Sequence, residues 1–452
     1  MKKRFFSLST SQIIMLSFLL TILVGSILLA LPVSSATNEA VPYIDALFTA
    51  TTSTCVTGLV TLTTASSWST FGHIVILCLI QAGGLGIITI LSGIMIILQK
   101  RMGLADRILL QDAFNLNSLS GLVKFVKRVF IGTFIVEITG ALLYMIVFVP
   151  EFGAKGIWIS LFTSVSAFCN AGIDIIGSNS LCNYATHPLI NTVTALLIIL
   201  GGLGYVVWWD LLRVTKNFKK QKLRCFQSLT LHSKLVLTAT AVLILAGALF
   251  IFVFEFGNPL TIGNMSLFDK IQVSLFQSIT TRTAGFASVP QENLSNGSAM
   301  VSLFLMFIGG SPVGTAGGVK TVTIVVLLAS ALATVRNRNE VTLFNRNLRK
   351  EAVSKAIAVT ATSFATLFIS TLLLCASTNA NALNILFETV SATATVGLSR
   401  NLTPYLDTFG KLVITATMYL GRIGPISLAV AFTLRKENKN IISNPTEKIS
   451  VG

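Results

Sequence analysis

Four short stretches of the chain share one frame, in which a leading Phe is followed by small and polar residues and then by a closing Gly. They read FTATTSTCVTG at 48–58, FTSVSAFCNAG at 162–172, FQSITTRTAG at 276–285 and FETVSATATVG at 387–397. The closing glycines recur about every 113 residues, which is typical of copies of one structural unit. Such stretches can turn main-chain carbonyl oxygens toward a common axis, where the oxygens replace the hydration shell of a monovalent cation.

The last four residues of each stretch are the candidate ion ligands. Their side chains differ among the copies, which is compatible with coordination by carbonyl oxygens. Each closing Gly supplies backbone torsions that a Cβ would hinder. The alternative is four ordinary re-entrant loops that only pack together, and the near-equal spacing argues against it. The candidate ligands are Cys55, Val56, Thr57, Gly58, Cys169, Asn170, Ala171, Gly172, Arg282, Thr283, Ala284, Gly285, Ala394, Thr395, Val396 and Gly397.

A short apolar run leads into each stretch, at 43–54, 158–168, 268–280 and 382–393. At ~1.5 Å per residue, a helix of about 11 residues covers only half of the ~30 Å hydrocarbon core of a bilayer. The chain must therefore enter the membrane at each run and turn back. The C-terminal end of the short helix carries partial negative charge, which favours a cation beside the stretch.

Longer apolar runs flank these elements. The outward runs are about 12–32, 128–150, 234–256 and 355–376, and the returning runs are 71–99, 188–212, 300–334 and 408–434. Two spans per unit bring every copy back to the same side, so the copies are parallel and can surround an axis along the membrane normal. The sequence predicts an all-α membrane protein with four parallel membrane–pore–membrane repeats, that is, eight transmembrane helices and four re-entrant pore helices around a pseudo-fourfold central pore. The predicted repeats are 1–110 (unit 1), 111–225 (unit 2), 226–345 (unit 3) and 346–452 (unit 4).

Composition supports a bilayer environment, because 53% of residues are hydrophobic and only 11% are charged, against about 25% charged in soluble proteins. The net charge of +16 does not indicate nucleic-acid binding, since most Lys and Arg lie in clusters between or beyond pairs of apolar runs. This distribution predicts a multi-pass protein of the cell membrane with both termini in the cytoplasm. The clusters are 2–4, 100–128, 213–234, 336–355 and 435–448.

Two returning runs carry unusual residues. The third contains GGSPVGTAGG at 309–318, which cannot remain regular helix. Non-helical backbone at membrane depth is tolerated only inside protein or beside water, although Gly-rich patches also serve close helix packing. The fourth contains Arg422 in its middle. A charge there is costly and usually marks a transport pathway; the alternative is an arginine that extends to the membrane surface.

Other polar residues have open assignments. Arg282 opposes a cation, so a structural salt bridge to Glu388 or to an acid in an outer loop is the expected role. Asp174 follows the second stretch and either concentrates cations or is an ordinary solvated loop residue. Glu137 is either an interhelical hydrogen-bonding partner or a functional group. The six cysteines lack CxxC spacing, and neither a catalytic triad nor a metal-ligand cluster stands out, so we expect neither an enzyme nor a covalently bound cofactor.

The chain resembles the ion-translocating subunits of the Trk/Ktr/HKT potassium transporter superfamily, and most closely its bacterial KtrB-like group. The resemblance covers nearly the whole chain. The motifs that carry it are TCVTGL at 54–59, CNAGI at 169–173, TRTAGF at 281–286, ATVGL at 394–398, IQAGGLG at 80–86, the Gly-rich segment 309–318 and YLGRIGP at 419–425.

This resemblance implies potassium uptake, with K+ held at the carbonyl oxygens of the four stretches and Gly58 at a position associated with potassium selectivity. It also implies stimulation by Na+, which the residues themselves do not indicate. The implied partners are a second copy of the chain in a homodimer and a cytoplasmic ring of RCK-type subunits that bind adenine nucleotides. The implied gate residues are Gly309, Gly310, Ser311, Gly314, Thr315, Gly317, Gly318 and Arg422.

Two other functions fit the sequence pattern less well. An alternating-access carrier would show broken helices paired in inverted halves, whereas the four copies here are parallel. A receptor or scaffold without transport would not need glycines at four equivalent positions.

Overall fold

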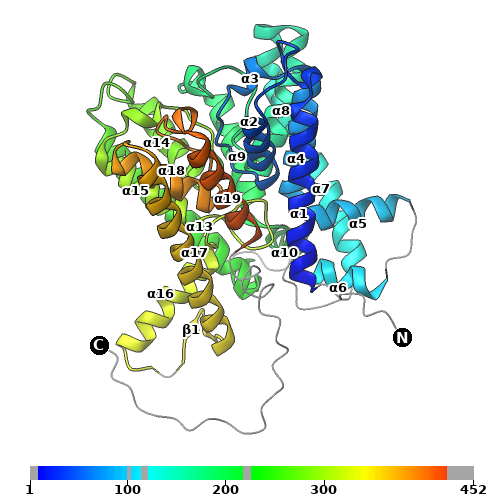
Figure 1. Ribbon diagram of the computed structural model, residues 1–452. Coiled ribbons are helices and arrows are strands. Elements are labelled where there is room, and N and C mark those ends of the chain that lie inside the picture. Colours follow the sequence, from blue (N-terminus) through cyan, green and yellow to red (C-terminus); the bar gives the residue numbers. More distant parts are fainter. Residues whose placement is uncertain (1–8, 99–102, 114–120, 217–224, 339, 425–452) are drawn as a thin grey trace.

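The computed structural model describes residues 9–98, 103–113, 121–216, 225–338 and 340–424 (Figure 1). Within these residues the fold is a helical bundle with one small hairpin of strands β1 (Thr342–Leu343) and β2 (Arg346–Asn347). The predicted all-α fold is confirmed. The hairpin lies within the basic cluster 336–355.

Four long helices follow the predicted outward runs: α1 (Thr10–Ala30), α7 (Leu122–Phe152), α13 (Leu231–Glu255) and α17 (Lys350–Ser377). Two of them are capped at the N-terminus by a side-chain hydroxyl. Ser9 accepts a hydrogen bond from the Gln12 N–H, and Thr230 accepts one from the Ser233 N–H. All four are long and apolar enough to cross a membrane, and two bent helix pairs in the described part of the chain raise that number to six. The chain is therefore a multi-pass membrane protein.

Four shorter helices match the predicted half-length runs: α2 (Tyr43–Cys55), α8 (Ala154–Cys169), α14 (Leu267–Thr280) and α18 (Ala382–Ala394). Each packs against the long outward helix of its own unit, and all four lie in the upper part of Figure 1. The last five residues of each are buried. We call them the pore helices.

The returning runs are not the straight spans that hydropathy predicts. Helix α4 (Thr70–Leu85) turns by 95° into α5 (Ile87–Ile97), and α9 (Pro188–Leu203) turns by 99° into α10 (Tyr205–Lys216). In the third unit, α15 (Asn296–Phe307) and α16 (Thr321–Val335) are separated by a loop over 308–320. In the fourth, α19 (Thr408–Ile423) ends at Gly424, and the rest of the predicted run lies outside the described residues.

Glycine pairs explain where three returning helices end. Gly86, Gly204 and Gly424 have φ values of 86°, 87° and 88°, a region that L side chains avoid. Three residues before each one, another Gly lies so close to the end of a pore helix that an added Cβ would contact a main-chain carbonyl. These contacts pair Gly83 with Thr54, Gly201 with Phe168 and Gly421 with Thr393.

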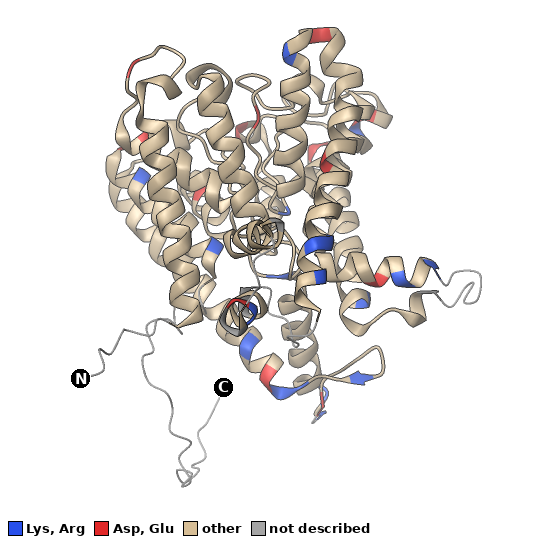
Figure 2. Ribbon diagram, turned by 90° about the vertical axis from the view of Figure 1, so that its right-hand side faces the viewer, with Lys and Arg blue, Asp and Glu red and all other residues tan. Residues whose placement is uncertain are grey.

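The remaining short elements lie in the connections. At the pore-helix end of the bundle, which we call the outer side, these are α3 (Thr64–Ser67) and the 3-10 turns η1 (Pro32–Ser34), η2 (Cys182–Tyr184), η4 (Gln291–Asn293) and η5 (Thr403–Tyr405). At the opposite end lie α6 (Leu104–Ala113), within the basic cluster 100–128, and α12 (Cys225–Ser228). Figure 2 shows most Lys and Arg in the lower half, away from the pore helices.

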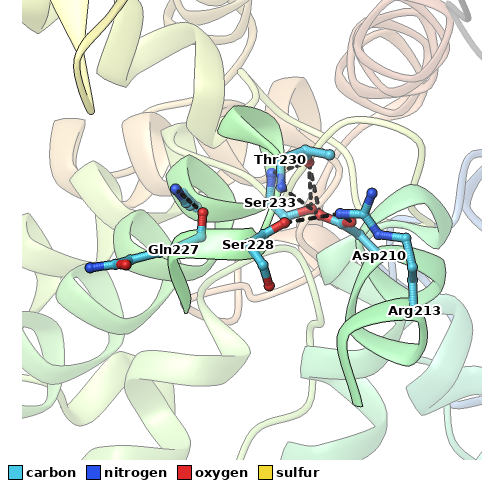
Figure 3. Close-up of polar contacts among 7 residues, drawn as sticks. Asp210, Arg213, Gln227, Ser228, Thr230 and Ser233 are labelled. Carbon is cyan, nitrogen blue, oxygen red and sulfur yellow. Dashed lines mark hydrogen bonds and ion pairs between the residues drawn. The ribbon is translucent and has the colours of Figure 1, made fainter. Parts of the chain in front are cut away.

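A buried carboxylate fixes the junction between α10 and α13 (Figure 3). Asp210 Oδ2 accepts hydrogen bonds from the Thr230 N–H and hydroxyl, both at 2.9 Å, and its Oδ1 lies 2.6 Å from Arg213 Nη2. Because Thr230 is also the residue that begins α13, one side chain joins the bent arm of unit 2 to the start of unit 3.

A second ion pair joins the first and last units. Lys411 Nζ on α19 lies 2.6 Å from Asp45 Oδ1 on α2, and the two side chains are 15% and 8% exposed. Breaking such a pair leaves an uncompensated charge, so Lys411→Met is expected to destabilise the protein by about 3 kcal/mol. Thermal unfolding in detergent measures this effect. The double variant with Asp45→Asn should regain most of the lost stability, and equal losses in the single and double variants would contradict the prediction.

Candidate ion pathway

The four closing glycines meet at one point. A Cβ added at Gly58 would lie 2.5 Å from the Ala171 carbonyl oxygen and 3.2 Å from the Cα atoms of both Gly172 and Gly397. The same relation passes around the ring, since each glycine faces the carbonyl of the residue before the next one. The facing pairs are Gly58 and Ala171, Gly172 and Ala284, Gly285 and Val396, and Gly397 and Thr57. The four stretches therefore converge in chain order around one axis, as predicted.

The backbone leaves each pore helix through a left-handed residue. Val56, Asn170 and Thr395 directly follow their helices with φ values of 55°, 60° and 50°. In the third stretch, which is one residue shorter, Thr283 takes this role with a φ of 67°. Left-handed conformations of β-branched residues are strained and persist only where the surroundings impose them.

One hydroxyl per unit holds the stretch, and these residues were missed by the sequence analysis. Thr52 Oγ1 accepts from the Gly58 N–H at 3.0 Å, and Ser391 Oγ accepts from the Gly397 N–H at 3.0 Å. Ser166 Oγ accepts from the Ile173 N–H, and the Thr280 hydroxyl donates to the Phe286 carbonyl. All four lie four positions after the leading Phe, so a comparison of the copies column by column would have found them.

An outer cavity of about 440 Å³ is lined by all four closing glycines. Asp174 and Glu292 are its two carboxylates. Asp174 is partly exposed; burial raises the pKa of its carboxyl, while hydrogen bonds from Ser180 and the Ile176 N–H oppose that rise. Its negative charge is therefore lost at a higher pH than usual.

An inner cavity of about 420 Å³ lies on the other side of the pore-helix ends, and residues of all four units line it. Its charged lining residues are Lys320, Lys355 and Arg422. Arg422 Nη1 donates to the Thr315 carbonyl at 2.6 Å, and its Nη2 donates to the Gly83 carbonyl at 2.5 Å. The arginine thus joins α19 both to α4 and to the Gly-rich segment rather than extending to a surface.

The Gly-rich segment is bonded to unit 2. Ser311 and Thr315 donate their N–H groups to Gly202 and Gly201 at 2.9 and 3.1 Å, and the Tyr205 N–H donates to Val313 at 3.0 Å. The Thr315 hydroxyl also donates to the carbonyl of Phe168, the residue just before the candidate ligands of the second stretch, at 3.1 Å.

The same segment also underlies the fourth stretch. A Cβ at Gly317 would contact the Thr395 hydroxyl and would lie 2.8 Å from the Ala394 carbonyl oxygen. The segment therefore lies directly beneath two of the four stretches.

These contacts answer two of the open assignments, those of Arg282 and Glu137. Arg282 Nη2 donates to the Gly309 carbonyl at 3.3 Å, while Glu388 accepts from two hydroxyls, so the salt bridge predicted between them is wrong. The two ion pairs in the described residues do not involve Arg282. Glu137 is an interhelical partner, since its carboxylate accepts from Gln81 at 3.3 Å and its carbonyl accepts from Ser164 at 2.6 Å.

Membrane-crossing helices around a narrow, glycine-lined axis are the architecture of a membrane transport protein. The chain belongs to the TrkH family, described as cation transport proteins, whose family model matches residues 4–443. It is 40% identical to Ktr system potassium uptake protein B of Bacillus subtilis over 95% of this chain and 94% of that protein.

Two further similarities agree with this family. The chain is 38% identical to the potassium/sodium uptake protein NtpJ of Enterococcus hirae, over 100% of this chain and 99% of that protein. The crystal structure of the potassium transporter TrkH from Vibrio parahaemolyticus superimposes with a TM-score of 0.74 and 16% identity, covering 96% of this chain and 86% of that one. The resemblance noted from the motifs is therefore confirmed.

Proposed function

We propose that this chain takes up potassium across the cell membrane, and that ions pass in single file through the ring of closing glycines. The observation that carries the proposal is the convergence of four carbonyl-bearing stretches on one axis. Carbonyl rings of this kind replace the hydration shell of a cation. The names of the relatives, two potassium uptake proteins and one potassium/sodium uptake protein, support K+ as the main substrate, with Na+ as a second transported or stimulating ion.

In this proposal the 16 candidate ligands form a selectivity filter, and four of them have side-chain oxygens that a solute in the filter could contact. Thr57, Asn170, Thr283 and Thr395 each carry a buried side-chain oxygen without a hydrogen-bond partner in the described structure. Buried polar atoms are costly unless paired. Water or a passing ion along the axis would satisfy them.

The gate in this proposal is the segment 309–318 together with Arg422. The segment lies under the second and fourth stretches, and Arg422 and Lys320 add positive charge to the inner cavity. Positive charge raises the energy of a cation in a low-dielectric passage. Opening therefore requires that the segment and the arginine move aside together.

Uptake of radioactive rubidium into liposomes that hold the purified protein tests the transport proposal. A membrane potential that is negative inside the liposomes should drive rubidium accumulation, and potassium should compete with rubidium. An equal concentration of sodium should compete at least about tenfold less, since fixed carbonyls discriminate between potassium and sodium. Uptake no greater than in empty liposomes would overturn the proposal. Equal competition by both cations would overturn the filter.

The assembly follows from the resemblance and remains part of the proposal. We expect four units with the boundaries predicted above, a homodimer, and a cytoplasmic nucleotide-binding ring that docks on the basic end of the bundle. Light scattering of the purified protein in detergent, with and without a candidate ring subunit, measures both associations. A monodisperse monomer would contradict the dimer.

A further inference from the structure

The outer ends of units 3 and 4 are joined by a buried polar network that has no counterpart in the described residues of units 1 and 2. Its first part is in unit 4, where the Glu388 carboxylate on α18 accepts hydrogen bonds from Ser399 Oγ at 2.7 Å and from the Thr403 hydroxyl. Ser399 is two residues past the closing Gly397, and Thr403 begins η5. The pore helix therefore holds the backbone that leaves the fourth stretch.

Unit 3 repeats the device with an amide pair. Gln277 Nε2 on α14 donates to Gln291 Oε1 at 2.6 Å, and Gln291 Nε2 donates back to Gln277 Oε1 at 3.2 Å. Gln291 begins η4, six residues past Gly285. Gln277 and Glu388 occupy the same position, directly after the leading Phe of the frame.

Arg400 connects the two parts. Its Nη1 donates to the Gln291 and Leu294 carbonyls at 3.1 and 3.3 Å, its Nη2 donates to the Glu292 carbonyl at 2.9 Å, and its Nε donates to Asn384 at 3.0 Å. Arg400 lies between Ser399 and Thr403, both bonded to Glu388. We call Gln277, Gln291, Glu388, Ser399, Arg400 and Thr403 the outer brace.

Units 1 and 2 tether their outer turns differently. His73 on α4 bonds the Thr64 carbonyl at 2.9 Å, and Asn191 on α9 donates to the Ala185 carbonyl at 2.6 Å. In both cases the turn is tied to the returning helix and not to the pore helix. Thr163, which matches Glu388 in the frame, has a buried hydroxyl without a partner in the described structure.

We propose that the outer brace sets discrimination between potassium and sodium, by fixing the spacing of the third and fourth stretches from outside the ring. This inference rests on the proposed function. A Cβ at Gly285 would lie 2.5 Å from the Val396 carbonyl oxygen, so these two stretches are direct neighbours in the ring. Ion coordination needs ligand positions held to a fraction of an ångström by a supporting shell. Without the brace, the stretches can close around the smaller ion.

Burial makes the bonds of the brace obligatory. Glu388, Gln277 and Gln291 are 0%, 1% and 3% exposed. A buried polar group without its partner costs more than the bond itself contributes, so the paired arrangement is strongly favoured. Glu388, Gln277 and Arg400 are therefore positioning residues, which act through the backbone and not on the ion.

The ratio of sodium to potassium concentrations that half-inhibit rubidium uptake tests the proposal in liposomes. Arg400→Lys keeps the charge but loses the fork that reaches several carbonyls, and it is expected to lower the ratio about tenfold, as is Glu388→Leu. Glu388→Gln can still bond both hydroxyls and should stay within about twofold of the unaltered protein. Thr163→Val is the matched control in unit 2 and should leave the ratio unchanged.

The outcomes separate cleanly. Arg400→Met removes both the charge and the hydrogen bonds of the guanidinium, and it should also lower the ratio. If the residue acts only electrostatically, the variant shifts both half-inhibiting concentrations in parallel; an unchanged ratio in Arg400→Met and Arg400→Lys overturns the proposal. A Thr163→Val effect equal to that of Glu388→Leu also overturns it. If Glu388→Leu does not fold, the partly exposed Arg400 variants decide. An unaltered protein that fails to discriminate the ions overturns the proposed filter itself.

Discussion

Gly58→Ser and Gly397→Ser are expected to reduce potassium uptake at low potassium at least about tenfold and to admit sodium relatively better. The φ values at these glycines are 105° and 98°, where a side chain costs about 1–3 kcal/mol in backbone strain. The new Cβ at Gly58 would also lie 2.5 Å from the Ala171 carbonyl oxygen, and the one at Gly397 would lie 2.8 Å from the Gly58 Cα. The ring must therefore shift, and the oxygens that would hold the ion shift with it.

Growth of a potassium-uptake-deficient strain at low potassium measures the effect, followed by rubidium uptake with competing sodium. Gly153→Ser is a matched control, because Gly153 also has a positive φ of 59° but nothing lies within 4 Å of a Cβ added there. It carries the strain without the contact with the ring. Equal growth of the Gly58 and Gly397 variants and the unaltered protein would contradict the filter.

The pore helices could be predicted closely from the sequence. The predicted run 43–54 is α2 (Tyr43–Cys55), and the predicted run 382–393 is α18 (Ala382–Ala394). The boundaries are local properties, since a half-length apolar run ends at a left-handed residue and a Gly shortly after. Repetition added strength, because four copies aligned on Phe and Gly reveal a frame that one copy would not.

The bends of the returning helices could not be predicted from hydropathy. An apolar run such as 71–99 has the same composition whether it is straight or turned by 95° at Gly86. The signal was a second repeat, in which Gly83 and Gly86, Gly201 and Gly204, and Gly421 and Gly424 share one spacing. Within each pair the first Gly allows close approach to a pore helix and the second ends the helix.

Partners of isolated charges were also beyond local reasoning. A carboxylate was the natural guess for the partner of Arg282, but the arginine donates to the main-chain carbonyl of Gly309, 27 positions away. Glu388 in turn is bonded by hydroxyls. Any residue supplies a carbonyl, so such pairs leave no trace in residue types. Arg282 and Arg422 both donate to main-chain carbonyls of the segment 309–318, at Gly309 and Thr315 respectively.

Arg422→Ala is expected to raise the rate of rubidium uptake about tenfold, which is the effect of removing a barrier of roughly 1.4 kcal/mol. The guanidinium donates to the Thr315 carbonyl at 2.6 Å and to the Gly83 carbonyl at 2.5 Å, so its loss frees α19 from both the Gly-rich segment and α4. It also removes one of the positive charges that line the inner cavity. Both changes lower the barrier to a cation that leaves the filter.

The two causes can be separated by substitution. Arg422→Lys keeps the charge but lacks the planar fork that bonds two carbonyls at once, so it should give an intermediate rate. Arg336→Ala removes an exposed arginine at the end of α16 and serves as the control, with an unchanged rate expected. An uptake rate in Arg422→Ala equal to or below that of the unaltered protein, at equal abundance, would remove Arg422 from the gate. The Gly-rich segment would then have to close the pathway through its bonds to unit 2 alone.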